Sequence, residues 1–291
     1  MMFKTSYEYI GILLPFIVSF TDDIIQQLSF LKKKNNSVLI SRLMTGKIKY
    51  KEPYFTGFIP KKVEKELLDK GAKKTSRGFY IKYEKLPQDI KRALVENKRE
   101  TQAVKREIIK ILQQTNDNIS LSLISSSYII KFIAMFYKHL QRLSTKKTQQ
   151  TIQQDYMSMI SDAISTTLTK TEQYISSQDF ISSSDLISKT IHLLKYHIKD
   201  KILNATNKIM FDYQAEDCKD NGYKSFYWWH NPVKKPSDRQ YHRKHFEDSK
   251  KGKKFYFNNL PTYQGEPDYP GKLWNCKCRA YVFWDEFKKK A

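Results

Sequence analysis

The stretch PQDIKRALVENKRETQAVKREIIKIL, residues 87–112, decides the fold class of this chain. Pro87 stands where a helix would begin, because proline is tolerated in the first turn. Apolar residues then recur along one stripe, while Lys, Arg and Glu fill the other faces; the stripe consists of Ile90, Leu94, Val104, Ile108 and Leu112. The stretch therefore predicts a long amphipathic helix.

The helical pattern continues downstream after a break predicted between Asn116 and Asn118. Two or three more amphipathic helices are expected, at about 119–143, 147–177 and 181–213, with Ile, Leu, Met and Tyr on one face and Ser, Thr and Gln on the other. The serine runs 125–127 and 182–184 are candidate helix boundaries or caps. The spacing holds no clean heptad, so a bundle or interaction scaffold is favoured over a long coiled coil. Residues 86–215 are thus predicted to be a helical scaffold.

Upstream, residues 1–85 read as a basic N-terminal region that contains a small α+β unit with a hairpin. Runs 48–50 and 54–58 are rich in β-prone residues. A short helix is expected between Pro60 and Gly71, and a hairpin should turn near Gly78. The apolar residues expected to face inward are Val63, Leu67, Leu68, Phe79, Ile81 and Tyr83.

The most apolar run is Ile10–Phe20, which contains Gly11, Pro15 and Ser19. It is shorter than the roughly 18 apolar residues of a membrane span. A signal peptide is the alternative, but no small-x-small cleavage site follows. We expect a buried helix continuing through Leu31, in a soluble intracellular protein or a particle component without membrane contacts.

Charge points to a polyanionic partner. The 291 residues include 52 Lys and Arg but only 30 Asp and Glu, which gives a net charge of +22. Basic residues exceed acidic ones by 12 in residues 1–110, by 1 in 111–190 and by 9 in 191–291. Such a balance favours phosphate contacts, and the predominance of Lys over Arg favours non-specific ones. The alternative is a solvated, lysine-rich surface.

Composition changes near residue 220, where Asp220-Asn221-Gly222 signals a turn. Aromatic residues 226–229, many lysines and several prolines follow, which predicts a small α+β domain over residues 220–291. A short helix should begin after Ser237, a favourable N-cap. Tyr227, Trp228 and Trp229 either form the core of this domain or stack on bases of single strands.

A candidate metal site lies in this region. His242 and His245 are spaced i and i+3, so both fall on one helix face. If residues 276–281 form a strand, Cys276 and Cys278 point to the same side. Two imidazoles and two thiolates make the tetrahedral set that structural zinc prefers. The alternative is that the histidines are exposed and the cysteines are ordinary reduced thiols.

Cysteine number bounds the redox environment. Three cysteines in a chain of this length exclude a disulfide scaffold and suit a reducing compartment. Cys218 has no matching partner in sequence and is expected to be a packed or idle thiol.

An ordered series of motifs runs through residues 228–283. It comprises Trp228 and Trp229, Asp238-Arg239, His242, His245, Gly252, Pro270 and Asn275-Cys276-Lys277-Cys278-Arg279. In this series the chain resembles the phage Mu protein F family, the minor head or head-morphogenesis proteins of tailed double-stranded DNA phages. Two positions depart from the family pattern: Arg239 directly follows Asp238, and Lys277 stands where the family usually has Arg.

The resemblance implies a virion protein at the portal vertex or in the head interior, present in the host cytoplasm during assembly. Family members associate with the portal in few copies and assist capsid assembly, DNA packaging or DNA delivery. The implied partners are portal protein, capsid proteins and non-specific DNA, with no small-molecule substrate. In this picture a DNA-backbone patch would consist of Lys234, Lys235, Arg239, Arg243, Lys244, Lys250, Lys251, Lys253 and Lys254.

Two other functions compete with this interpretation. One is a cellular nucleic-acid-binding protein with a small zinc module. The other is a metal-dependent nuclease built on Asp238, His242 and His245. A catalytic zinc keeps one position open for water, whereas two His and two Cys would close the site. The sequence also shows no glycine-rich phosphate loop and no Ser/His/Asp order, so an enzyme is not expected.

Overall fold

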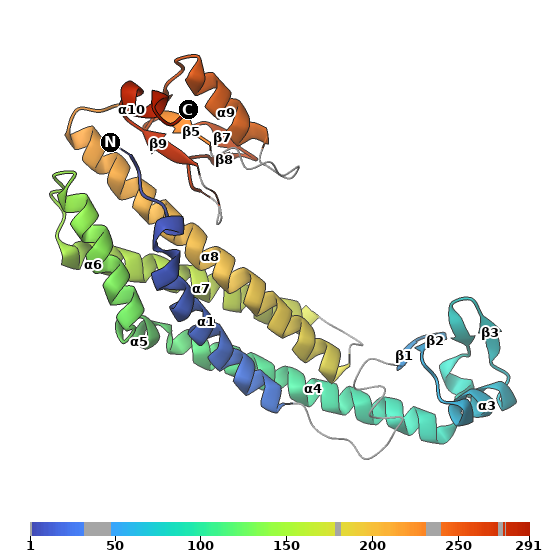
Figure 1. The fold of residues 1–291 in the computed structure, drawn as a ribbon. Helices are drawn as coiled ribbons and strands as arrows, with labels where there is room; N and C mark the ends of the chain where they lie inside the picture. The colour runs from blue at the N-terminus through green and yellow to red at the C-terminus, as the bar shows by residue number, and fades with distance from the viewer. Residues whose placement is uncertain (1, 32–47, 178–181, 231–239, 273–275, 277) are drawn as a thin grey trace. The chain divides into compact units, whose positions relative to one another are not determined.

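The computed structural model describes residues 2–31, 48–177, 182–230, 240–272, 276 and 278–291. The described chain is mostly helical, with small antiparallel sheets, an early hairpin sheet and a C-terminal α+β region, as predicted (Figure 1). The chain divides into two compact units, and each unit is built from segments that are not continuous in sequence. The first contains Met1–Phe20, Asn118–Ser165 and His197–Ala291, and the second contains Thr21–Asp117 and Thr166–Tyr196.

The long helix predicted from residues 87–112 is α4, Gln88–Asp117, in the second unit. Ile90, Val104, Ile108 and Leu112 are buried and Leu94 is half-buried, so the predicted stripe is confirmed. In the same unit, α4 is hydrogen-bonded to the end of α7, Gln149–Ser177. Lys105 Nζ donates to the Ser176 carbonyl oxygen, and Gln113 Nε2 donates to Glu172 Oε1.

The predicted N-terminal α+β unit is present. Strands β1 (Ile48–Lys51), β2 (Tyr54–Gly57), β3 (Lys73–Thr75) and β4 (Gly78–Tyr80) form an antiparallel sheet in the order β1-β2-β4-β3. Helix α3, Lys61–Asp69, buries Val63 and Leu67. Leu68 was also expected to face inward but is 45% exposed, because it lies about 100° around the helix from Leu67.

The hairpin of this sheet depends on one glycine. Gly78 has φ +120°, and a Cβ there would lie 2.1 Å from the Phe55 carbonyl oxygen. Only glycine permits both the backbone angle and the close approach of β4 to β2. The core beneath the sheet, named here the hairpin core, is wholly apolar: Phe55, Val63, Leu67, Ala72, Phe79, Ile81, Leu86, Ile90 and Ala93. Tyr83 packs against it half-buried.

The first unit contains a packed set of helices. It includes α5, Ile119–Ile124, and α6, Ser127–Gln141, together with the part of α8, Ser183–Asp220, that begins at His197. The segment expected as one helix at 119–143 is divided at the serine run 125–127, as that run indicated, and Ser126 caps α6 by accepting a hydrogen bond from Ile129 N. The helix expected at 181–213 continues to Asp220. The break expected between residues 116 and 118 is confirmed.

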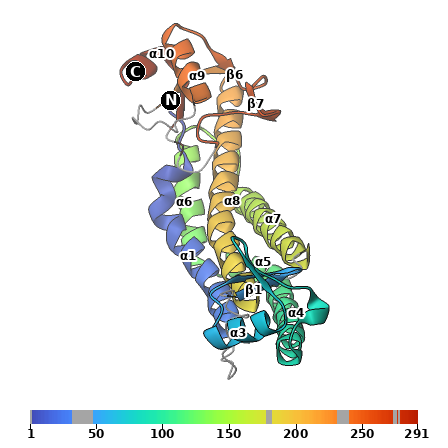
Figure 2. The ribbon, with the colours of Figure 1, turned by 90° about the vertical axis from the view of Figure 1, so that its right-hand side faces the viewer.

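Helix α1, Ser6–Phe30, confirms the expected buried N-terminal helix. Leu13, Ile17 and Phe20 are among its buried residues. Its first half lies beside α6 and the last half of α8 (Figure 1 and Figure 2), and the Tyr9 and Phe132 ring centroids are 5.4 Å apart. No helix in the described part of the chain has the length and hydropathy of a membrane span.

The C-terminal α+β region, residues 225–288, is called the C-terminal module below. Its three-stranded antiparallel sheet has the order β6 (Phe255–Tyr256), β5 (Ser225–Trp229), β9 (Arg279–Tyr281). Helices α9, Gln240–Lys250, and α10, Trp284–Lys288, pack on it (Figure 1). A short hairpin pairs β7, Thr262–Tyr263, with β8, Glu266–Pro267.

The N-terminal residues extend this module. Met2 forms a bridge with Tyr281, and Phe3 N donates to the Ala280 carbonyl oxygen at 3.1 Å. The Phe3 ring is 2% exposed and stacks on Phe257 at 5.7 Å. The module's core therefore includes a residue from the N-terminal end of the chain.

Candidate metal centre

Helix α9 carries one wall of the candidate site. Its buried residues are His242, Phe246 and Ser249, which recur at i, i+4 and i+7 and so form one face against the sheet. Ser249 Oγ accepts a hydrogen bond from Trp228 N at 2.8 Å, which connects this face of α9 to β5. The same face presents the His242 ring, which is 0% exposed. The predicted N-cap Ser237 lies outside the described residues.

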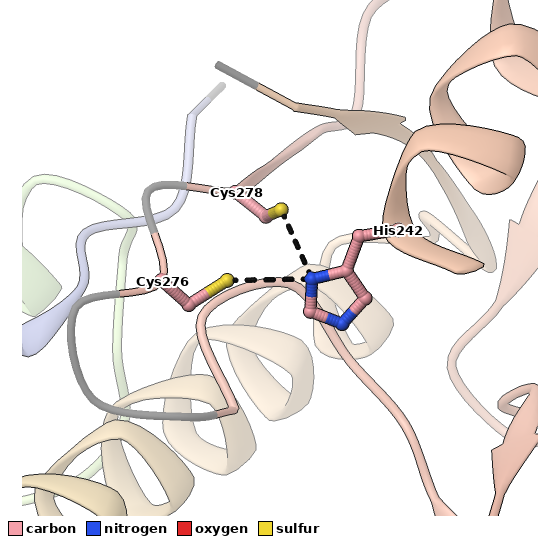
Figure 3. Close-up of side chains that lie close together, drawn as sticks. All are labelled: His242, Cys276 and Cys278. Carbon is pink, nitrogen blue, oxygen red and sulfur yellow. Dashed lines mark hydrogen bonds between the residues drawn. The ribbon is translucent and has the colours of Figure 1, made fainter. Parts of the chain in front are cut away.

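The two cysteines approach the same imidazole from the segment before β9. His242 Nδ1 lies 3.5 Å from Cys276 Sγ and 3.3 Å from Cys278 Sγ (Figure 3). All three ligand atoms lie within 4.8 Å of one another, and all three residues are buried. The strand expected from residue 276 begins only at Arg279, yet the i, i+2 spacing still brings both sulfurs together.

These distances fit a tetrahedral metal. With Zn–S bonds of about 2.3 Å and Zn–N bonds of about 2.0–2.1 Å, a sulfur and a nitrogen ligand lie about 3.6 Å apart. Both nitrogen–sulfur distances are within a few tenths of an ångström of that value. The buried His242, Cys276 and Cys278 group could therefore hold a metal ion.

The other nitrogen of His242 faces a buried carboxylate. His242 Nε2 lies 3.4 Å from Asp268 Oδ1 and 3.3 Å from Oδ2, and Asp268 is 1% exposed. Burial by itself lowers the pKa of His242, but hydrogen bonds to Asp268 and Cys276 outweigh it and raise the pKa above its usual value. A carboxylate on the far nitrogen is the common outer partner of a metal-binding histidine.

His245, the second histidine predicted as a ligand, is outside the group that the structure brings together. Its Nε2 lies 3.9 Å from Asp268 Oδ2, and its ring packs on Trp228 and Phe255 at 4.7 and 5.0 Å. Burial lowers the pKa of His245, although Asp268 acts in the opposite direction. His245 lies one helical turn after His242, and its side chain points at the Asp268 carboxylate and at the aromatic rings of Trp228 and Phe255.

The structure also places a histidine that the motif analysis missed. His230 is 8% exposed and directly follows β5, and its Nδ1 lies 3.1 Å from Cys278 Sγ. In the β5–β9 pairing, Trp228 faces Ala280 and Trp229 faces Arg279, so the next pair in this register is His230 and Cys278. The aromatic run before His230 and the alternating residues around Cys278 indicate that these two residues meet. They indicate it only when β5 and β9 are known to pair.

The aromatic run of β5 forms core. Trp228 is 0% and Tyr227 is 7% exposed, which confirms the core interpretation for both and removes their faces from contact with bases. Trp229 is half-buried and its Nε1 donates to the Lys290 carbonyl oxygen. Cys218, in α8, is fully buried, as expected for a packed thiol.

Part of the predicted DNA-backbone patch lies on the outer face of α9 and the turn after it. Its described members are all exposed: Arg243, Lys244, Lys250, Lys251, Lys253 and Lys254. Lys250 pairs with Glu247 and Lys253 with Asp248, whose pKa is lowered by the Lys253 hydrogen bond. The other predicted members, Lys234, Lys235 and Arg239, lie outside the described residues, as does Asp238.

Comparisons with protein-family models, with curated proteins and with solved structures gave no match to this chain.

Proposed function

We propose that the C-terminal module is held together by a structural zinc ion, with His242, Cys276 and Cys278 among its ligands. The observation that carries this proposal is the convergence of three buried ligand atoms from α9 and from a segment more than 30 residues later. A bound zinc would cross-link these segments. The module is small and its strands are short, and small domains commonly gain stability from such a cross-link.

For the whole chain we propose the role of a phage minor head protein that associates with the portal. It would assist capsid assembly, DNA packaging or DNA delivery through contacts with portal protein and non-specific contacts with DNA. This proposal rests on the resemblance to the phage Mu protein F family. It is supported by the position of the metal group at the motif residues, by the helical body and by the exposed basic residues of α9.

Elemental analysis of the purified full-length protein tests the zinc proposal. We expect about one zinc ion per chain, and loss of zinc in Cys276→Ser and Cys278→Ser. Cys218→Ala is the matched control, because it removes a buried thiol outside the metal group and should keep the zinc. A folded, reduced wild-type chain without metal would refute the site.

Co-sedimentation with the portal protein of the same genome tests the wider role. We expect the chain to stay on the portal ring at salt concentrations that release it from DNA. Replacing Arg243 or Lys244 by Ala should lower the salt slope of DNA binding by about 1 each, while portal binding is retained. Tight DNA binding without any affinity for the portal ring would instead favour a nucleic-acid-binding zinc-module protein.

A further inference from the structure

The three converging residues leave one corner of a tetrahedron to be filled. This corner decides the chemistry of the site, because a zinc with three protein ligands can bind water and act as a catalyst, whereas four protein ligands make it structural. Among the described residues near the sulfurs there are three nitrogen or oxygen donors to consider, from His230, His245 and Asp268.

His245 and Asp268 are poorly placed for this corner. Asp268 faces Nε2 of His242, the nitrogen on the opposite edge of the ring from the two sulfurs. His245 points its own Nε2 at Asp268, at 3.9 Å. Both side chains therefore belong to the shell behind His242, where they orient or pack against the ring.

His230 lies on the sulfur side. Its Nδ1 is 3.1 Å from Cys278 Sγ, which is within about half an ångström of the nitrogen–sulfur separation expected on zinc. The backbone also holds it there, because the β5–β9 register brings residue 230 opposite residue 278. His230 and His242 both present Nδ1 to Cys278, from the end of β5 and from α9 respectively.

We propose that His230 is the fourth ligand, so that His230, His242, Cys276 and Cys278 form a closed N2S2 zinc site. The inference rests on the proposed zinc binding. His230 lies outside the group whose ligand atoms are all within 4.8 Å of one another, so its ring must move toward Cys276 and His242 when metal binds. The ion then joins the end of β5, α9 and the segment before β9, which gives the site a structural role and leaves no position for a reactive water.

Cobalt substitution of the full-length protein reports both the number and the type of ligands. Wild-type protein should show the ligand-field bands of a four-coordinate site and charge-transfer absorption from two thiolates. His230→Ala should weaken zinc binding by at least about 100-fold and shift the ligand-field bands, because a nitrogen ligand is replaced by water. The matched variant His245→Ala removes no proposed ligand, so it should keep the four-coordinate ligand-field bands and the charge transfer of two thiolates.

The alanine variant could lose metal simply because it fails to fold, so a second variant places a new ligand at residue 230. His230→Cys should bind cobalt with the stronger charge transfer of three thiolates, which a merely structural position at residue 230 would not produce. If His245→Ala changes the spectrum and His230→Ala does not, His245 is the fourth ligand and the inference is wrong. If neither variant changes it, neither histidine is the fourth ligand, which overturns the inference. Failure of wild-type protein to bind any metal would refute the zinc proposal itself.

Discussion

The molecule contains two small α+β regions that are stabilised in different ways. The hairpin core, in the second unit, buries only apolar side chains under its sheet. The C-terminal module has an aromatic core as well, but it also buries His230, His242, Ser249 and Asp268. Buried polar groups destabilise a fold unless they are paired. The first region therefore needs only its apolar pattern, whereas the second also needs partners for its buried polar groups.

Metal removal should separate the two regions most strongly. With a chelator, backbone amides of β5, α9 and β9 are expected to lose protection in hydrogen exchange, because the proposed cross-link between them is gone. Amides of β2, β4 and α3 should exchange as before, since the hairpin core contains no ligand. Equal loss of protection in both regions would show that they are not stabilised separately.

Removing a buried aromatic ring from the hairpin core should destabilise that region and leave the C-terminal module unaffected. Phe55 is 0% exposed at the centre of the hairpin core, so Phe55→Ala is expected to cost about 3–5 kcal/mol of local stability. Phe58→Ala, at a ring that is 73% exposed, is the control and should cost far less. Zinc content should stay unchanged in both variants, and a Phe55→Ala chain that loses zinc would contradict independent stabilisation.

A milder change addresses the carboxylate behind His242. Asp268→Asn keeps the shape of the side chain but weakens its hold on Nε2 of the imidazole. Loss of such an outer partner typically lowers metal affinity 10–100-fold, so we expect about a 10-fold weaker zinc affinity in competition with a chromophoric chelator. Asp285→Asn, at an exposed position of α10, should bind zinc like wild type. An unchanged affinity in Asp268→Asn would remove the orienting role of this carboxylate.

The smallest effect concerns a buried acid outside the metal group. Burial raises the pKa of Asp217, in α8, to about 6, although a hydrogen bond from Thr145 opposes the shift. A raised pKa in the folded state means that protonated Asp217 contributes stability at low pH, which is lost as the pH rises through about 6. Asp217→Asn should therefore stabilise the chain by on the order of 1 kcal/mol above pH 7 and by less near pH 4.

The effect of Asp217 on stability should not depend on the metal site of the C-terminal module. Because Asp217 is not a member of the metal group, the stability difference between Asp217→Asn and wild type should be the same with and without chelator. A difference that disappears on chelation would link Asp217 to the metal site.

The sequence predicted the parts of the structure that depend on local periodicity. The stripe of α4 and the alternation of Phe79 and Ile81 in the hairpin follow from backbone geometry alone, and they were recovered. The pair Cys276 and Cys278 was also recognisable, because i, i+2 spacing brings two sulfurs to one side. The serine runs 125–127 and 182–184 were recognisable as candidate helix boundaries, and Ser126 and Ser182 do cap α6 and α8.

The set of residues around the sulfurs needed the tertiary structure. Helical spacing placed His242 and His245 on one face, but a turn of helix separates them, and only His242 reaches the sulfurs while His245 meets Asp268. His230 is close to Cys278 because β5 and β9 pair in one particular register across almost 50 residues. Periodicity is a property of neighbouring residues, so the sequence by itself determined the helices, the hairpin and the cysteine pair. Strand register and the packing of α9 on the sheet are set by long-range contacts, and they decided which histidines stand beside the cysteines.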